Sequence, residues 1–158
     1  MANANLVAGL LGQPPPPQPS ARPATPPPPP DSGSGRRVVY SNPGQRVWLV
    51  EANGRVTRSY AVSGRQGMPS PGNYSVFSKS RVSRSASGSL KLEYMVRFAQ
   101  GTTLPIGFHA IPTRASGDAI QSEAELGQFR SAGCVRQRKA DAAFLWDWAP
   151  VGISVVVI

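Results

Sequence analysis

Residues 90–98 have the sequence Leu-Lys-Leu-Glu-Tyr-Met-Val-Arg-Phe, and they set the fold class. Leucine, tyrosine, valine and phenylalanine occupy the even positions, whereas lysine, glutamate, methionine and arginine occupy the odd ones. Successive side chains of a strand point to opposite faces, so a period of two is typical of a half-buried β-strand. The stretch therefore predicts a strand that turns one face to the core.

Other apolar stretches predict further strands. Residues 46–51 are rich in β-branched and aromatic side chains, and the pair Asn53-Gly54 follows them. An Asn-Gly pair is typical of a type I′ hairpin, because both central residues tolerate a positive φ. We expect strands at 38–40, 46–51, 56–62, 73–77, 90–98, 104–110 and 153–158.

Two short segments predict helices. Ser122 and Glu125 have the spacing of a capping box, and Gly127 is placed to end that turn in a left-handed conformation. Residues 137–148 contain neither glycine nor proline, and Pro150 stops them. The predicted fold is therefore mainly β, a sandwich or partly open barrel with one or two short helices.

The N-terminal part differs in composition from the rest of the chain. Eleven of the eighteen residues 13–30 are proline, which lacks an N–H and fixes φ. At about 3.1 Å per residue, this stretch predicts a polyproline II spacer of roughly 55 Å. We expect residues 1–35 to be a disordered N-terminus and proline-rich linker, and residues 36–158 to be one domain.

A short apolar stretch lies at residues 6–11. It is too short to span a bilayer, and it lacks the basic start of a secretory signal. It fits either the end of a signal or anchor that begins further upstream, or a disordered N-terminus. No integral membrane span is expected in this chain.

The formal net charge is +9, and arginine supplies most of the positive side. These arginines are scattered among polar residues, without a compact basic run or interleaved aromatic rings. Nucleic acid is therefore not expected as a partner. Attraction to an anionic matrix and a solvated basic surface that needs no partner both stay open.

The chain has one cysteine, Cys134, and one histidine, His109. A single cysteine excludes an intramolecular disulfide framework and a zinc site of the multi-cysteine type. A thiol beside a base can act as a nucleophile, and Gly133 lets backbone N–H groups approach an oxyanion. The pair is a candidate for acyl transfer through a thioester. The alternative is a small buried cysteine and a structural histidine.

Three motifs resemble the L,D-transpeptidase (YkuD-type) family. Residues 106–109, followed by Ser-Ala-Gly-Cys-Val-Arg at 131–136, are similar to its histidine segment and its Ser-His-Gly-Cys-Ile/Val-Arg signature. Residues 70–76 resemble its Thr-Pro-x-Gly-x-Phe/Tyr-x-Val strand entry, and residues 140–157 are similar to the C-terminal run of actinobacterial members. The resemblance covers residues 36–158.

The resemblance implies an L,D-transpeptidase-like catalytic domain of the bacterial cell envelope, acting outside the cytoplasm. In the family, the cysteine attacks the carbonyl of the third residue of a peptidoglycan tetrapeptide stem, expels the terminal D-alanine and passes the acyl group to an amine. This reaction cross-links the cell wall, and water as acceptor gives L,D-carboxypeptidase activity instead. Stem peptides are the implied partners, carbapenem-type β-lactams are the implied inhibitors, and no metal or organic cofactor is implied. We expect a monomer.

The resemblance also implies a role for each site residue. Cys134 is the nucleophile, His109 is the general base, and Gly133 with Ser131 forms the oxyanion turn. Arg136 is placed to bind a substrate carboxylate through a bidentate contact, or alternatively to contact a loop carbonyl. We expect the His109 ring to lie within hydrogen-bond reach of the Cys134 sulfur.

Two departures from the family pattern affect this site. The family's histidine before the Gly-Cys pair is Ala132 here, and residues 114–118 resemble an inserted loop that could reshape the acceptor side. Neither departure removes the nucleophile or its base. Ala132 nevertheless motivates a second hypothesis, a non-catalytic module that binds peptidoglycan.

Overall fold

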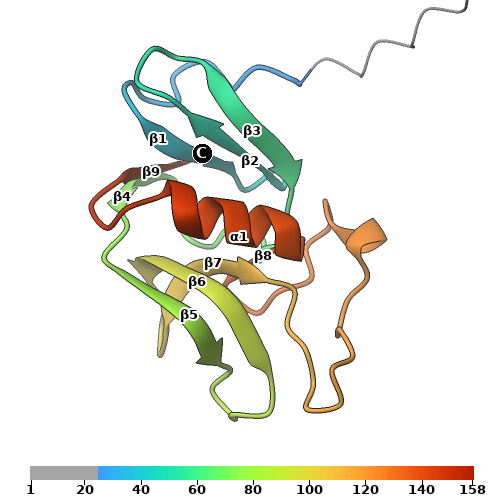
Figure 1. Cartoon of the computed structure of the whole chain (residues 1–158). Helices are drawn as coiled ribbons and strands as arrows, with labels where there is room; N and C mark the ends of the chain where they lie inside the picture. Colours follow the sequence, from blue (N-terminus) through green and yellow to red (C-terminus); the bar gives the residue numbers. More distant parts are fainter. Residues whose placement is uncertain (1–24) are drawn as a thin grey trace, which may run out of the picture.

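The computed structural model describes residues 25–158, which form two β-sheets with the helix α1 (Lys139–Trp148) between them on one side (Figure 1). The predicted fold class, mainly β with the sheets in a sandwich, is confirmed. The five-stranded sheet has the order β3 (Val56–Ala61), β2 (Arg46–Val50), β1 (Arg37–Ser41), β9 (Ser154–Val157), β4 (Gly72–Ser75). The four-stranded sheet has the order β5 (Ser78–Arg84), β6 (Lys91–Gln100), β7 (Pro105–Ala110), β8 (Val135–Gln137).

The five-stranded sheet is built around two apolar strands that run parallel, β1 and β9. Val38 pairs with Val155 and Val39 with Val156, and every residue of β1 is buried. A strand that is buried on both faces needs consecutive apolar residues, and these two strands have Val-Val-Tyr at 38–40 and Val-Val-Val at 155–157. The outer face is partly covered by the start of the described chain, since the Trp48 indole N–H donates to the Pro26 carbonyl at 2.8 Å.

The core lies between the two sheets, and aromatic rings connect them. The Phe98 ring of β6 stacks on the Phe108 ring of β7 with the centroids 4.5 Å apart. The Tyr40 ring of β1 meets Phe108 edge-on at 6.1 Å. Leu145 of α1 joins the same core and is fully buried. These contacts hold β7, and the residues at its end, at a fixed position against the five-stranded sheet.

Strand β6 contains the stretch with the period of two, but its alternation is interrupted. The residues predicted to face inward include the buried Leu92, Val96 and Phe98, whereas Met95 and Ala99 of the opposite parity are buried as well. Tyr94 has a φ of 57°, and the register against β7 shifts near Phe98. Both irregularities rotate side chains between the faces, so β6 is covered on both sides.

Three details of the prediction were incomplete or wrong. Strands β5 and β8 were not predicted, because β5 is the polar edge sequence Ser-Lys-Ser-Arg-Val-Ser-Arg and β8 has only three residues. The long helix begins at Lys139 and not at residue 137, because Gln137 ends β8. The type I′ turn is absent: only Gly54 has a positive φ, 87°, and its N–H donates to the Glu51 carbonyl at 2.9 Å.

The predicted capping box is present at the single-turn 3-10 helix η1 (Glu123–Glu125). The Glu125 carboxylate accepts from the Ser122 backbone N–H at 3.3 Å and from its hydroxyl at 3.1 Å. Gly127 has a φ of 103°, the left-handed conformation expected of it.

The apolar stretch 6–11 and most of the proline-rich stretch lie outside the described residues. Within residues 25–158, no helix has the length and apolar character that crossing a bilayer requires.

The ring contacts of Phe108 predict a strong effect of its removal. Phe108→Ala leaves a cavity between the sheets, and we expect it to lower the free energy of unfolding by about 3 to 5 kcal/mol in urea denaturation. Val151→Ala, at a side chain that is 59% exposed, serves as the control and should change it by under about 0.5 kcal/mol. Equal losses in the two variants would contradict this account of the core.

Candidate active site

The parallel pairing of β7 with β8 brings the candidate residues together. His109 is paired with Arg136 in the register of the two strands, so their side chains share one face of the sheet. Cys134 lies in the bend directly before β8 and lines the same cavity as His109 and Arg136. Phe108 and Val135, which are also paired, point to the opposite face and into the core. The core packing of one face thus fixes the position of the site on the other.

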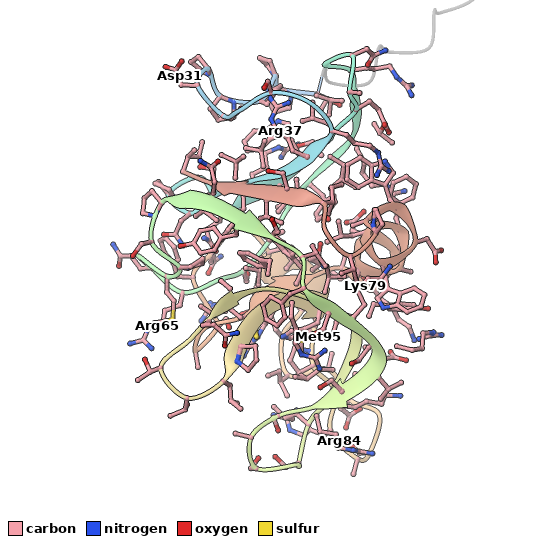
Figure 2. All side chains as sticks on the ribbon, turned by 90° about the vertical axis from the view of Figure 1, so that its left-hand side faces the viewer. Asp31, Arg37, Arg65, Lys79, Arg84 and Met95 are labelled. Carbon is pink, nitrogen blue, oxygen red and sulfur yellow. The ribbon has the colours of Figure 1, made fainter. Side chains whose placement is uncertain are left out.

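This face opens into a cavity of about 520 Å³. Cys134, His109 and Arg136 line it together with the turn residues 131–133. Apolar side chains from β6, β7 and the loop between them form much of the wall, whereas no aspartate or glutamate among residues 25–158 lines it. The Arg65 guanidinium is at the rim, where it donates to the Ala132 carbonyl at 3.2 Å, and Figure 2 shows this side chain at the periphery. The cavity suits a substrate with apolar segments and negative charge.

His109 is 2% exposed, and a backbone carbonyl orients its ring. Nδ1 lies 2.6 Å from the carbonyl oxygen of Ala110. Because a carbonyl only accepts, Nδ1 carries the proton and Nε2 keeps its lone pair. Burial lowers the pKa of His109 to about 4, against the effect of the Ala110 hydrogen bond and with a smaller contribution from the Arg136 charge. The ring is therefore neutral at neutral pH, with Nε2 able to take a proton.

The Cys134 thiol is half-buried and protonated at neutral pH. Burial raises its pKa, whereas the Gly107 N–H and the charges of Arg97 and Arg136 act in the opposite direction. The sulfur lies 3.8 Å from the Pro105 carbonyl oxygen, to which it donates weakly. In the described part of the chain, no hydrogen bond joins this sulfur to His109. The observed partner of the sulfur is the Pro105 carbonyl, and the role of His109 as the base for Cys134 stays a prediction.

The turn before Cys134 is organised by Ser131. Its hydroxyl accepts a hydrogen bond from the Gly133 N–H at 3.1 Å. The Gly133 N–H is therefore already occupied, which leaves the Cys134 N–H as the turn's candidate donor to an oxyanion. A Cβ at Gly133 would lie 3.6 Å from the Met68 sulfur, an ordinary contact. Glycine here keeps the approach to the thiol open and is not required by a left-handed backbone.

Arg136 is half-buried beside the thiol and has a neutral partner. Its guanidinium donates to the Gln121 side-chain oxygen at 3.1 Å, and Gln121 in turn donates to the Ser63 hydroxyl at 2.8 Å. Among residues 25–158, no carboxylate forms a salt bridge with Arg136. Its remaining N–H groups are available to a carboxylate in the cavity.

Arg97 is a second cation near the thiol, and it was not singled out from the sequence. It is paired with Gly107 of β7, and its guanidinium donates to the hydroxyls of Ser78, Ser80 and Ser83 at 3.2, 2.9 and 3.3 Å. Gly107 has no room for a side chain, since a Cβ would lie 2.6 Å from the Met95 sulfur. The nearest of these serines is 14 residues from Arg97 in the sequence, so no local pattern indicated this contact, and the Ala110 carbonyl left no signal either.

The two departures from the family pattern lie in different places. Ala132 lines the cavity, and its carbonyl is held by Arg65. Residues 114–118, which we expected to be an inserted loop, form a tight turn in which the Arg114 N–H donates to the Asp118 carbonyl at 2.8 Å. None of residues 114–118 lines the catalytic cavity. The expectation that this loop reshapes the acceptor side is not supported by its position.

Fold and site together define a class of protein, a two-sheet β domain with a candidate cysteine–histidine site at the end of a parallel strand pair. The chain belongs to the YkuD family, because the family's model, described as the L,D-transpeptidase catalytic domain, matches residues 35–158. The resemblance inferred from the three motifs is thereby confirmed. No curated protein sequence matches the chain.

Solved L,D-transpeptidase structures share the fold. The structure of LdtMt1 in complex with imipenem has a TM-score of 0.62 at 23% identity and covers 80% of this chain and 60% of that one. An L,D-transpeptidase from Mycobacterium smegmatis has a TM-score of 0.63 at 20% identity, with 80% and 59% covered. L,D-transpeptidase 3 from Mycobacterium tuberculosis, in complex with a faropenem-derived adduct, has 0.59 at 20% identity, with 79% and 60% covered. The chain thus spans about 60% of the length of these structures.

The raised pKa of Cys134 predicts how its alkylation depends on pH. Iodoacetamide is neutral and reacts with the thiolate, so we expect the midpoint of the rate profile to lie above that of a free cysteine. Arg97→Gln removes a charge that favours the thiolate and should move the midpoint to higher pH. Arg97→Lys keeps the charge, so its midpoint should stay close to that of the unsubstituted protein. Arg55→Gln, an exposed change of the same charge far from the cavity, is the control. Equal midpoints in all four proteins would contradict the role of Arg97.

The lowered pKa of His109 predicts a loss of stability in acid. Below pH 6.5 the unfolded chain binds a proton at this side chain, and the folded chain does so only near pH 4, so unfolding gains protons between these values. The shift from 6.5 to about 4 corresponds to about 3 kcal/mol, present above pH 6.5 and lost as the pH falls to 4. The free energy of unfolding of His109→Gln, measured in urea, should lack this part of the decrease in acid. The carboxylates contribute equally in both proteins. An identical pH dependence in the two proteins would show that burial does not shift His109.

Proposed function

We propose that the chain is a cysteine-dependent peptidoglycan L,D-transpeptidase that acts in the cell envelope, outside the cytoplasm. It transfers an acyl group from a tetrapeptide stem, through a thioester on Cys134, to an amine acceptor in cell-wall cross-linking. One observation carries this proposal: His109 of β7 and Cys134, in the turn directly before the parallel strand β8, line the same cavity, and a backbone carbonyl orients the histidine. No metal or organic cofactor takes part in the proposed reaction.

The first half-reaction forms the thioester. The Cys134 sulfur attacks the carbonyl carbon of the third stem residue, and the S–H proton passes to Nε2 of His109. The oxygen of the resulting tetrahedral adduct becomes negative and accepts from the Cys134 N–H. The C–N bond to the terminal D-alanine then breaks, and the proton on Nε2 goes to the leaving nitrogen. Before attack, the sulfur has to turn from the Pro105 carbonyl toward His109.

The second half-reaction releases the acyl group. An acceptor amine attacks the thioester carbon, His109 Nε2 takes the proton of this amine, and the C–S bond breaks as the sulfur regains a proton. Water in place of the amine would give L,D-carboxypeptidase activity. The apolar wall of the cavity limits the water near the thioester, so aminolysis is the favoured outcome.

Charge supports the assignment of Arg136 to substrate binding. Arg136 has spare donors beside the thiol, and its observed partner is the neutral amide of Gln121. A stem peptide carries carboxylates, which a guanidinium binds in a bidentate manner. Since no acidic side chain of the described residues lines the cavity, a negatively charged peptide meets no repulsion from them.

A non-catalytic peptidoglycan-binding module is the second candidate. It is favoured by Ala132 in place of the family's histidine and by the hydrogen bond of the sulfur, which goes to the Pro105 carbonyl at 3.8 Å and not to His109. Such a module would bind peptidoglycan equally well with or without the thiol. The two candidates therefore differ in whether Cys134 becomes acylated.

Acylation by a carbapenem separates these candidates. The described complexes of LdtMt1 with imipenem and of L,D-transpeptidase 3 with a faropenem-derived adduct support imipenem as the probe. We expect intact-mass spectrometry to show one imipenem adduct on the protein and none on Cys134→Ala. With a tetrapeptide muropeptide, loss of D-alanine should depend on both Cys134 and His109. A folded protein that gives neither adduct nor released D-alanine would overturn the enzymatic proposal in favour of the binding module.

A further inference from the structure

A second cavity, of about 280 Å³, lies on the other face of β6 from the catalytic cavity. Leu92 lines the catalytic cavity and its neighbour Lys91 lines the second one, and successive side chains of a strand point to opposite faces. We call the second cavity the basic hollow. Its lining residues are Arg84, Lys91, Thr113, Arg114, Ala115 and Gly117.

The fold places three cations around the basic hollow. Arg84 is paired with Lys91 at the last rung between β5 and β6, and Figure 2 shows Arg84 at the end of the molecule where this hairpin turns. Lys91 is joined to Thr113 by two backbone hydrogen bonds of 2.9 and 3.1 Å. Arg114 follows Thr113 directly, at the start of the inserted loop. The loop that left no mark on the catalytic cavity thus forms one wall of the basic hollow.

These cations are poorly neutralised by the protein. Like charges directly opposite on neighbouring strands are destabilising, and Arg84 and Lys91 form such a pair. The Glu93 carboxylate lies 3.7 Å from the Lys91 ammonium, but it also forms ion pairs with Arg81 at 3.9 Å and Lys139 at 3.0 Å. One negative charge is therefore shared among three cations.

The inserted loop supplies no compensating charge either. The Asp118 carboxylate accepts from the Ser116 hydroxyl at 3.0 Å and does not line the basic hollow. Within the described chain, no salt bridge reaches Arg84 or Arg114. The repulsive pair of Arg84 and Lys91 lies beside a third cation, Arg114, and this accumulation of positive charge indicates a site for a negative ligand.

We propose that the basic hollow binds an oxyanion, a phosphate or a carboxylate, that belongs to a polymer of the cell wall. Two guanidinium groups and an ammonium match a group with several acceptor oxygens, and arginine binds both phosphate and carboxylate in a bidentate manner. The hollow is large enough for one such group and its linkage. In the part of the chain that the structure describes, no aromatic residue lines the hollow, so no ring is offered there on which a nucleobase would stack. Only the choice of a wall polymer rests on the proposed function.

This site would hold the domain on the wall while the catalytic cavity stays free. The two cavities lie on opposite faces of β6, so a polymer bound at the basic hollow does not occupy the thiol. A domain anchored in this way meets stem peptides at a high local concentration.

The test compares two double variants that remove the same charge. Arg84→Gln/Arg114→Gln changes the basic hollow, and Arg46→Gln/Arg55→Gln changes the five-stranded sheet and its hairpin. Binding to purified peptidoglycan sacculi is measured by co-sedimentation at several salt concentrations, and inorganic phosphate is titrated by NMR. We expect binding to sacculi to weaken about tenfold in the first variant and less than about twofold in the second. Equal weakening in both, or tighter binding of duplex DNA than of sacculi, would overturn the proposal.

Two further arms complete the test. Sacculi stripped of phosphodiester-linked polymers with hydrofluoric acid identify the source of the oxyanion. If stripping removes the difference between the variants, the ligand is phosphate, and if the difference persists it is a carboxylate. Imipenem acylation of Cys134 should be unchanged in Arg84→Gln/Arg114→Gln. Sacculus binding that depends on the basic hollow in a protein that imipenem does not acylate would overturn the transpeptidase proposal alone.

Discussion

The parallel pairing of β7 with β8 is the interaction on which the rest of the site depends. The pairs Phe108 with Val135 and His109 with Arg136 use the two faces of the same rungs for different purposes. One face is packed into the core against Tyr40 and Phe98, and this packing sets the position of the two strands relative to the five-stranded sheet. The other face then presents the imidazole and the guanidinium beside the thiol. A slip of one residue in this register would turn the site residues into the core and the core residues into the cavity, so the core enforces the site geometry.

β8 has only three residues, and its position is held by contacts at both ends. Arg136 exchanges two backbone hydrogen bonds with Ser63, 2.8 and 2.9 Å long, which connects β8 to the segment after β3. Gln137 accepts from the Tyr60 hydroxyl, also from β3. α1 begins two residues later, and its buried Asp141 accepts from Arg58 of β3 at 3.1 Å. The five-stranded sheet thus fixes a strand of the other sheet. A strand of only three residues is stable here because contacts from neighbouring elements add to its ladder with β7.

The predictability of each element follows the range of the interactions that form it. The period of two in residues 90–98 predicted β6, because alternation is a local property of the sequence. It did not predict the left-handed Tyr94 or the bulge near Phe98, because neither irregularity has a signature in the alternation itself. β5 was missed because its residues are polar and only the ladder to β6 makes it a strand. The roles of Cys134 and His109 remain predictions that came from family motifs. The hydrogen bond between the Ala110 carbonyl and the His109 ring could not be predicted, because every residue has a carbonyl and only the fold determines which of them contacts the ring.

The electrostatics of the cavity connect burial to the proposed reaction. Burial raises the pKa of the thiol and lowers the pKa of the imidazole, so the resting pair is neutral. A neutral pair is the cheaper state in an apolar cavity, because an isolated thiolate or imidazolium would lose its hydration there. When the sulfur attacks a carbonyl carbon, a C–S bond and an oxyanion form. At the same time the imidazole takes the thiol proton and becomes positively charged. Arg97 and Arg136 lie where they favour negative charge near the sulfur, and the low dielectric strengthens their effect. Burial thus suppresses the free thiolate, and it also strengthens the stabilisation of the charged adduct by the two arginines. Together these effects favour reaction with a bound substrate over reaction with solutes at the cavity mouth.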